Sequence, residues 1–470
     1  AFQGVRISVR WLRQLPELIR ATEGMTVVVA NRGVIGIERG DTTRHSYGAA
    51  IDLGSTTIVA FLIDLNSGKE VAVASLLNRQ SLYGDDIVAR LARAQDNPAG
   101  LALMHDSIVA QIDELLGELA AQAGIELSRI HQVVVVGNMA MHHFLLGLDS
   151  THLGLAPYAP VTRDSVAVTA GELGLRLGPD VPLYVLPNIA GFVGSDTVAV
   201  VLAAQLHVLP GVRMAIDVGT NSEVVLASNS RLLACSAPAG PAFEGARIKQ
   251  GMRAAPGAID HVWIDTDVRC SVIGRSLPHG VCGSALVDIV AGLLDAGLMD
   301  SSGKLLRRCE LAPAVPERLR ERIREADDRR DLAFVLVWAE AAGTGQDVVF
   351  TQQDVRQFQL AKGAIRAGAM VLQQTVGVDD EDLDEVLLAG AFGNFLDLAN
   401  ARRTGLVPAV PIDRLRSIGN AAGVGARLAL TSAPECAAAE RIGRRTEHIR
   451  LSGLDDFQRA FIQAMRFPEL

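Results

Sequence analysis

The chain has 470 residues, more than one ordinary domain contains, so we expect two to four domains. Its 44 Lys and Arg and 53 Asp and Glu give a net charge of −9, which argues against nucleic acid or an anionic membrane as the main partner. Hydrophobic residues make up 49% but aromatic residues only 4%, a composition that is typical of an α/β protein and argues against disorder.

The cysteines are scattered along the chain, and no two have C-x-x-C spacing: they are Cys235, Cys270, Cys282, Cys309 and Cys436. We therefore expect neither a disulfide framework nor a metal or iron–sulfur site made by this chain alone, and a reducing, cytoplasmic compartment. The longest apolar stretch, residues 281–299, contains two Asp residues, which predicts a buried helix and not a membrane span.

Residues 1–48 differ from the rest of the chain. They predict a strand that runs into a helix, followed by two short strands joined at Asn31-Arg32-Gly33. This segment is too small to bury a robust core by itself. We interpret it as the α+β remnant of a small domain or a linker module.

A repeat organises the remaining sequence. Residues 50–59 read AIDLGSTTIV and residues 215–224 read AIDVGTNSEV. Each copy predicts a strand, a tight turn and a second strand. The repeat divides the chain into a first subdomain at 49–211 and a second one, with a C-terminal segment, at 212–470.

Each half later returns with an apolar strand that ends in Gly and Asn. Residues 131–138 read HQVVVVGN and residues 385–394 read EVLLAGAFGN. Such runs are typical of strands covered on both faces. Apolar residues at three-four spacing predict helices between them, over residues 85–97, 100–124, 283–299 and 355–377.

The repeated turns have the composition of phosphate-binding loops. A carboxylate ends a buried strand, Gly allows a sharp turn, and backbone N–H groups and hydroxyls follow. The candidate phosphate ligands are Gly54, Ser55, Thr56, Thr57, Gly219, Thr220, Asn221 and Ser222. Asp52 and Asp217 are the candidate catalytic and Mg²⁺-binding carboxylates. A single D-x-G-[ST] turn is more often a hairpin with a capping Asp, but its duplication reverses this preference and favours phosphate.

A third segment suits an adenine ring lying against backbone. It comprises Gly390, Ala391, Phe392, Gly393 and Asn394, and the corresponding turn of the first half contains Gly137 and Asn138. The alternative is an ordinary Gly-rich turn. The chain lacks both a P-loop and a Rossmann fingerprint, so those routes to a nucleotide are excluded.

As a set, these segments resemble the sugar kinase, heat-shock 70 and actin superfamily of ATPases. The resemblance covers about residues 50–430 and implies duplicated ribonuclease H-like, actin/hexokinase-type domains with a nucleotide cleft between them, together with ATP and Mg²⁺ as cofactors.

A narrower resemblance rests on residues 234–259, 279–300, 351–369, 387–397 and 418–430. These segments are similar to the reductive activators of corrinoid proteins, which couple ATP hydrolysis to reduction of Co(II) corrinoid to Co(I). The resemblance implies a corrinoid-protein partner, an electron donor and a homodimer. Such activators usually carry an N-terminal ferredoxin-like domain with a 2Fe-2S cluster. No such cysteine pattern occurs here, so we expect that cluster only on a domain absent from this chain or on a separate protein.

Other residues have two possible roles each. Glu223 could point at the nucleotide or be a solvated strand residue, and Glu244 could orient the attacking water or pair with a loop cation. Gly280, Gly283 and Ser284 begin a helix whose N-terminus could face phosphate. Candidate partner-facing residues are Ser236, Arg247 and Lys249.

Three other functions compete with the activator hypothesis. A small-molecule kinase would need an Asp base, for which Asp85-Asp86 is the candidate. A non-enzymatic nucleotide switch would need an appended polymer- or peptide-binding surface. An activator of 2-hydroxyacyl-CoA dehydratases would need paired cysteines, which the scattered ones match badly.

Overall fold

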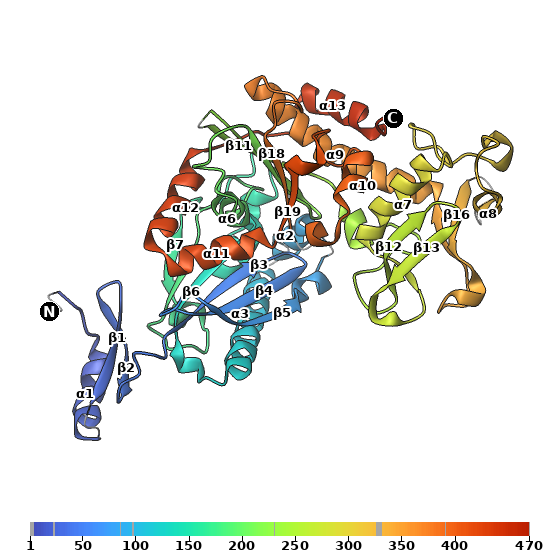
Figure 1. Ribbon diagram of the computed structural model, residues 1–470. Coiled ribbons are helices and arrows are strands. Elements are labelled where there is room, and N and C mark those ends of the chain that lie inside the picture. Colours follow the sequence, from blue (N-terminus) through green and yellow to red (C-terminus); the bar gives the residue numbers. More distant parts are fainter. Residues whose placement is uncertain are drawn as a thin grey trace. The chain divides into compact units, whose positions relative to one another are not determined.

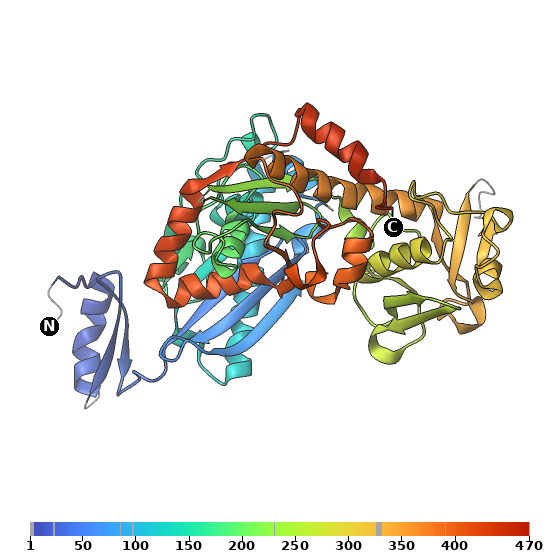
Figure 2. The same cartoon turned by 45° about the horizontal axis from the view of Figure 1, so that its top comes forward.

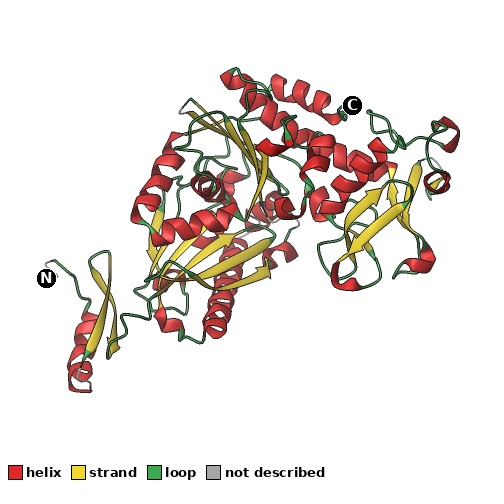
Figure 3. Cartoon of the chain, viewed as in Figure 1, coloured by secondary structure: helices red, strands yellow, loops and turns green. Residues whose placement is uncertain are grey.

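The computed structural model describes residues 4–21, 24–84, 86–95, 98–229, 231–325, 331–390 and 392–469. The chain forms two compact units. Unit 1 comprises Ala1–Gln205 and Ala421–Thr446, and unit 2 comprises Leu206–Asn420 and Glu447–Leu470. Both units combine helices with strands, as Figure 3 shows.

The helices of unit 1 are α1 Val9–Ala21, α2 Ile87–Gln95, α3 Pro98–Ala123, α4 Met139–Leu146, α5 Ala170–Leu173, α6 Ser195–Ala203, α11 Ala421–Thr431 and α12 Ala433–Arg445. Its strands are β1 Met25–Ala30, β2 Gly33–Arg39, β3 Tyr47–Leu53, β4 Thr57–Asp64, β5 Glu70–Leu77, β6 Ile130–Gly137, β7 Val166–Thr169 and β8 Pro182–Val185.

The core of unit 1 is a six-stranded sheet in the order β5-β4-β3-β6-β8-β7. Strands β3, β4 and β5 form an antiparallel meander, and β6 and β8 continue the sheet parallel to β3. Helix α3 packs against β4 and β5, while α11 packs against β3 and β6 (Figure 1). This cover explains why β3 and β6 are almost continuously apolar.

The helices of unit 2 are α7 Gly283–Asp295, α8 Glu317–Glu321, α9 Gln352–Val376, α10 Leu398–Arg403 and α13 Asp455–Met465. Its strands are β9 Arg213–Asp217, β10 Ser222–Ser228, β11 Arg231–Ala237, β12 Ala258–Ile264, β13 Val268–Val272, β14 Gly280–Val281, β15 Ile323–Glu325, β16 Leu332–Val337, β17 Val348–Thr351, β18 Glu385–Ala389 and β19 Leu415–Gly419, and β20 Thr446–His448 joins its main sheet.

The main sheet of unit 2 has the order β19-β18-β9-β10-β11-β20. Strands β9, β10 and β11 form an antiparallel meander, and β18 and β19 run parallel to β9. This order and direction repeat those of unit 1, which confirms the duplicated α/β fold. Two three-stranded sheets, β13-β12-β14 and β15-β16-β17, form a separate lobe of unit 2 in Figures 1 and 2.

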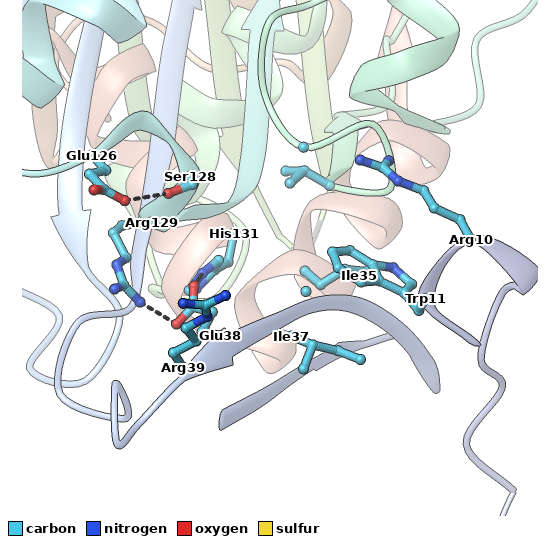
Figure 4. A pocket seen from close by; sticks show the side chains of 13 residues that line it. Arg10, Trp11, Ile35, Ile37, Glu38, Arg39, Glu126, Ser128, Arg129 and His131 are labelled. Atoms are coloured by element: carbon cyan, nitrogen blue, oxygen red, sulfur yellow. Dashed lines mark hydrogen bonds and ion pairs between the residues drawn. The ribbon is translucent and has the colours of Figure 1, made fainter. Parts of the chain in front are cut away.

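The N-terminal segment forms the predicted hairpin of β1 and β2. Its turn residues Asn31 and Arg32 have φ of 47° and 62°, the left-handed pair that a tight hairpin of this kind requires. Glu38 of β2 contacts Arg129 and lies 3.2 Å from His131 Nε2 at the start of β6. A cavity of about 280 Å³ lies beside these residues, and Trp11 also lines it (Figure 4).

One stretch lies where the sequence did not place it. The predicted second subdomain, 212–470, includes residues 421–446, yet α11 and α12 pack against α6 in unit 1. The contact is close, because a side chain at Gly425 would overlap the backbone of Ala199. Chain order alone did not indicate this return to the first sheet.

Candidate nucleotide site

The first predicted phosphate loop, residues 54–57, connects β3 to β4 and is called loop 1. Gly54 is required there, because a Cβ atom at this position would overlap the carbonyl oxygen of Thr57. Ser55 and Thr56 follow it, and Thr57 begins β4. Asp52 is the penultimate residue of β3 and is half-buried. The loop therefore starts where the central strand of the sheet ends.

The turn after β6 lies directly beside this loop. Gly137 pairs with Leu53, and a Cβ atom at Gly137 would lie 2.7 Å from the Leu53 carbonyl oxygen. Asn138 caps α4, since its side-chain oxygen accepts hydrogen bonds from the N–H groups of Ala140 and Met141 at 3.1 and 3.0 Å. The structure thus brings Gly137 together with loop 1, and it gives Asn138 a helix-capping role.

Asp196 is a candidate site residue that the sequence reasoning missed. It lies in the first turn of α6, and its neighbour Gly194 packs so closely on the 137–138 turn that a Cβ atom would overlap the backbone there. Burial raises the pKa of Asp196 to about 6. A carboxylate of this kind could orient water near a phosphate. The Gly-Ser-Asp sequence that precedes an apolar helix was the available signal.

The second predicted phosphate loop, residues 219–222, connects β9 to β10 and is called loop 2. Three polar residues line up beside it. Asp217 pairs with Glu223, and Glu223 pairs with Ser236 on the next strand. Residues directly opposite each other point to the same face of a sheet. Ser236 Oγ donates a hydrogen bond of 3.0 Å to Glu223 Oε1, so these two side chains contact each other within the row.

The Gly-rich segment after β18 meets this row. Gly390 has φ of +91°, and a Cβ atom there would lie 2.6 Å from Asp217 Oδ1. The two residues are 173 positions apart, yet strand β18 pairs in parallel with β9 so that Ala389 lies opposite Asp217. The structure therefore brings the second predicted phosphate loop and the predicted adenosine segment together within unit 2.

Other residues of loop 2 form contacts within the loop or with neighbouring residues. Ser222 is fully buried, and its hydroxyl bonds the backbone of Gly219. Thr220 Oγ1 contacts the Glu244 carboxylate, which places Glu244 against the loop. Asn221 is exposed at the turn.

The Gly280–Ser284 stretch has a largely structural environment. Gly280 belongs to β14, where a Cβ atom would overlap the carbonyl oxygen of Gln250. Gly283 and Ser284 are buried at the start of α7, and Ser284 Oγ donates to the Asp260 carbonyl oxygen at 2.8 Å. Helix α7 packs against the short helix Pro241–Glu244, which connects this stretch to the loop 2 neighbourhood.

The segment after β11 forms a tight exposed loop. A Cβ atom at Gly245 would lie 2.6 Å from the backbone of Met252, so the loop between them closes on itself. Arg247, with φ of 63°, and Lys249 are exposed on this loop. The Lys249 N–H donates to Asp354 Oδ1 at 2.8 Å, which fixes the loop to α9.

Some predicted residues cannot be located. Ala391 and Asp85 lie outside the described residues, as do the side chains of Phe392 and Asn394. Gly393 is described, and its N–H donates to the Gly390 carbonyl oxygen at 3.1 Å. Among the described residues, no group of three or more His, Cys, Asp or Glu side chains could hold a metal ion, and no helix is long and apolar enough to cross a membrane.

Comparisons with known proteins agree with this fold. Residues 211–470 match the family described as the C-terminal domain of RACo, the ASKHA domain, and residues 47–209 match the RACo middle region. The corrinoid activation enzyme RamQ of Eubacterium limosum is 35% identical over 444 residues, covering 94% of this chain and 74% of the relative.

The names of two further matches state which kind of protein each of them acts on. The [Co(II) methylated amine-specific corrinoid protein] reductase of Methanosarcina barkeri is 28% identical over 373 residues, covering 77% of this chain and 66% of the relative. The solved structure of a reductive activator for corrinoid, iron–sulfur protein superposes with a TM-score of 0.86 at 35% identity, covering 99% of this chain and 73% of that one. This chain therefore belongs to the RACo family of ASKHA-fold reductive activators of corrinoid proteins.

Proposed function

We propose that this chain is the ATPase and partner-docking module of a reductive activator. It hydrolyses MgATP and uses the nucleotide to promote one-electron reduction of a partner corrinoid from Co(II) to Co(I). The electron comes from a 2Fe-2S domain or a separate ferredoxin-like protein. Family membership supports this class of reaction.

The observation that carries the proposal is the contact between Asp217 and Gly390. Asp217 ends a central strand at a half-buried position, and Gly390 leaves room for its carboxylate. A carboxylate of this kind suits Mg²⁺, which is usually held through one or two carboxylates together with phosphate oxygens and water. Asp217 would hold the ion, and the ion would neutralise phosphate charge during hydrolysis.

Loop 1 supplies the corresponding carboxylate in unit 1, Asp52. The expectation that both loops bind one nucleotide stays a prediction, as does the homodimer. Glu244, which contacts Thr220, and Asp196 are the candidates to orient the attacking water.

The partner would dock on residues 234–259. Arg247 and Lys249 are exposed there on a closed loop, and Ser236 lies nearby on β11. Nucleotide can promote reduction only by changing the affinity for one partner state, because an equilibrium shifts only as far as the affinities differ. The ATPase rate should therefore respond to the Co(II) partner.

Asp217→Asn tests the proposal with an almost isosteric change. The variant should lose at least 99% of the ATPase rate, about 2.7 kcal/mol in activation free energy, while its melting temperature stays close to that of the wild type. Wild type with MgATP, a low-potential reductant and a Co(II) corrinoid protein should convert the Co(II) electron paramagnetic resonance signal to silent Co(I). Normal hydrolysis by Asp217→Asn would disprove the site. Phosphorylation of a sugar or short-chain acid, with an ATPase indifferent to any corrinoid protein, would favour a kinase instead.

A further inference from the structure

Three consecutive carbonyl groups of loop 1 accept hydrogen bonds from two residues, Asn78 and Arg90. The Gly54 oxygen accepts from Asn78 Nδ2 at 2.9 Å, and the Thr56 oxygen accepts from the Asn78 backbone N–H at 2.9 Å. Between them, the Ser55 oxygen accepts from Arg90 Nη1 at 2.6 Å. We call Asn78 and Arg90 the carbonyl clamp.

The clamp determines where the N–H groups of the loop point. The peptide bonds here are trans, and a trans peptide holds its C=O and its N–H on opposite sides. Because the oxygens of residues 54–56 face the clamp, the N–H groups of Ser55, Thr56 and Thr57 are directed away from it. Successive N–H groups that point the same way form an anion-binding concavity.

Both clamp residues are themselves rigidly held. Asn78 is fully buried, and its Oδ1 accepts from the Gln80 N–H at 3.0 Å. The adjoining chain is tied to α3 by Gln111, which accepts from the Arg79 N–H and donates to the Leu77 carbonyl oxygen. The clamp therefore connects the loop to α3 and not only to its own strands.

Arg90 is the largest of the fully buried side chains, at 1% exposure. Its Nε donates to the Gly84 carbonyl oxygen at 2.9 Å, and a Cβ atom at Gly84 would overlap the backbone N of Arg90. A guanidinium stays charged at all relevant pH values, and burying one is costly. Its Nε and Nη1 donors reach backbone oxygens, one of them in loop 1, so the guanidinium is anchored against the loop.

We infer that Asn78 and Arg90 are positioning residues for nucleotide binding: by holding the carbonyl groups of loop 1, they orient its N–H groups toward phosphate. This inference rests on the proposed function, since the ligand is the phosphate chain of MgATP. The competing role is a structural tie between β5, α2 and the loop without effect on the ligand.

Three clamp variants and one control variant separate these roles. Asn78→Asp keeps the shape and the Gln80 contact but replaces the donor to Gly54 with an oxygen. Arg90→Met removes the guanidinium at similar volume, and Arg90→Lys restores a positive donor. Arg322→Met is the matched control, because Arg322 is also buried and donates to the carbonyl oxygens of Val335 and Leu336, far along the chain in unit 2.

For each variant, melting temperature without nucleotide, the MgATP dissociation constant by calorimetry, and KM and kcat are measured. Asn78→Asp and Arg90→Met should weaken MgATP binding about tenfold or more, the size expected when buried groups lose their partners. Arg90→Lys should recover part of this loss. Arg322→Met should lower the melting temperature and leave MgATP affinity within about twofold.

The inference would be overturned if every clamp variant bound MgATP as tightly as the wild type. It would also be overturned if clamp variants and Arg322→Met with equal melting temperatures lost the same amount of MgATP affinity. If Arg90→Met does not fold, Asn78→Asp and Arg90→Lys decide the question. Failure of the wild type itself to bind MgATP would instead overturn the proposed function.

Discussion

Gly390→Ala is the most informative single change, because it adds one methyl group beside Asp217 and nothing else. The new Cβ atom would lie 2.6 Å from Asp217 Oδ1, whereas ordinary contacts begin at 3.4 Å. The carboxylate must therefore move by about 0.8 Å, since the other neighbours of this position are the backbone atoms of Val218.

Two costs follow from this geometry. The φ of +91° at Gly390 costs an alanine about 1–3 kcal/mol of folding free energy. Displacing a catalytic carboxylate by nearly 1 Å costs about 100-fold in rate. We therefore expect Gly390→Ala to fold with a lowered melting temperature and to retain about 1% of the MgATPase activity.

The control is Gly377→Ala, at the end of α9. Gly377 has φ of +72° and nothing within 4 Å of its added Cβ atom, so it matches the backbone strain without touching the site. The assay is steady-state MgATP hydrolysis at temperatures below both melting transitions. Equal activity in the two variants would refute the reasoning, because strain alone would then account for the effect.

Three further outcomes are expected. The pKa of Asp196, raised by burial to about 6, predicts that the ATPase rate falls as the pH drops through 6 and that Asp196→Asn removes this dependence; a flat wild-type profile from pH 5.5 to 7.5 would contradict it. Arg247→Glu with Lys249→Glu should weaken the corrinoid-protein complex at least tenfold in a binding titration and leave MgATP affinity within about twofold; unchanged complex affinity would place the docking surface elsewhere. Burial lowers the pKa of Lys362 to about 7 from 10.5, so between these pH values the unfolded chain binds more protons than the folded one and the stability contribution of Lys362 rises with pH. In urea unfolding, the free energy of unfolding of the wild type relative to Lys362→Met should therefore be larger at pH 9.5 than at pH 7. An equal difference at the two pH values would be evidence against this reasoning.

Local sequence patterns predicted several of the elements. The helix expected over residues 355–377 begins slightly earlier, at Gln352, because the Thr351 side chain caps it and exchanges hydrogen bonds with Asp354. The helix expected over 283–299 ends at Asp295, shortly before Gly297, which has φ of +65°. These signals act within a few residues, so the sequence carries them directly.

The candidate site was predictable only in part. The duplicated Asp-x-Gly turns identified Asp52 and Asp217, because a repeat within one chain is a strong signal. Asp196 was missed, because tertiary contacts of its neighbours Gly194 and Ser195 with the 137–138 turn bring it to the site. Asn78 and Arg90 were missed for a similar reason: their donors reach loop 1 from residues 22 or more positions away.

By itself, the sequence determined the duplication, the strand-turn-strand loops and the family resemblance, since these depend on residue type and spacing. Tertiary structure decided which distant residues meet: Gly390 against Asp217 across β18 and β9, the clamp beneath loop 1, and the return of residues 421–446 to unit 1. Parallel pairing and helix packing bring together segments that have no local signal for one another, because the free energy that holds them comes from burial shared over the whole unit.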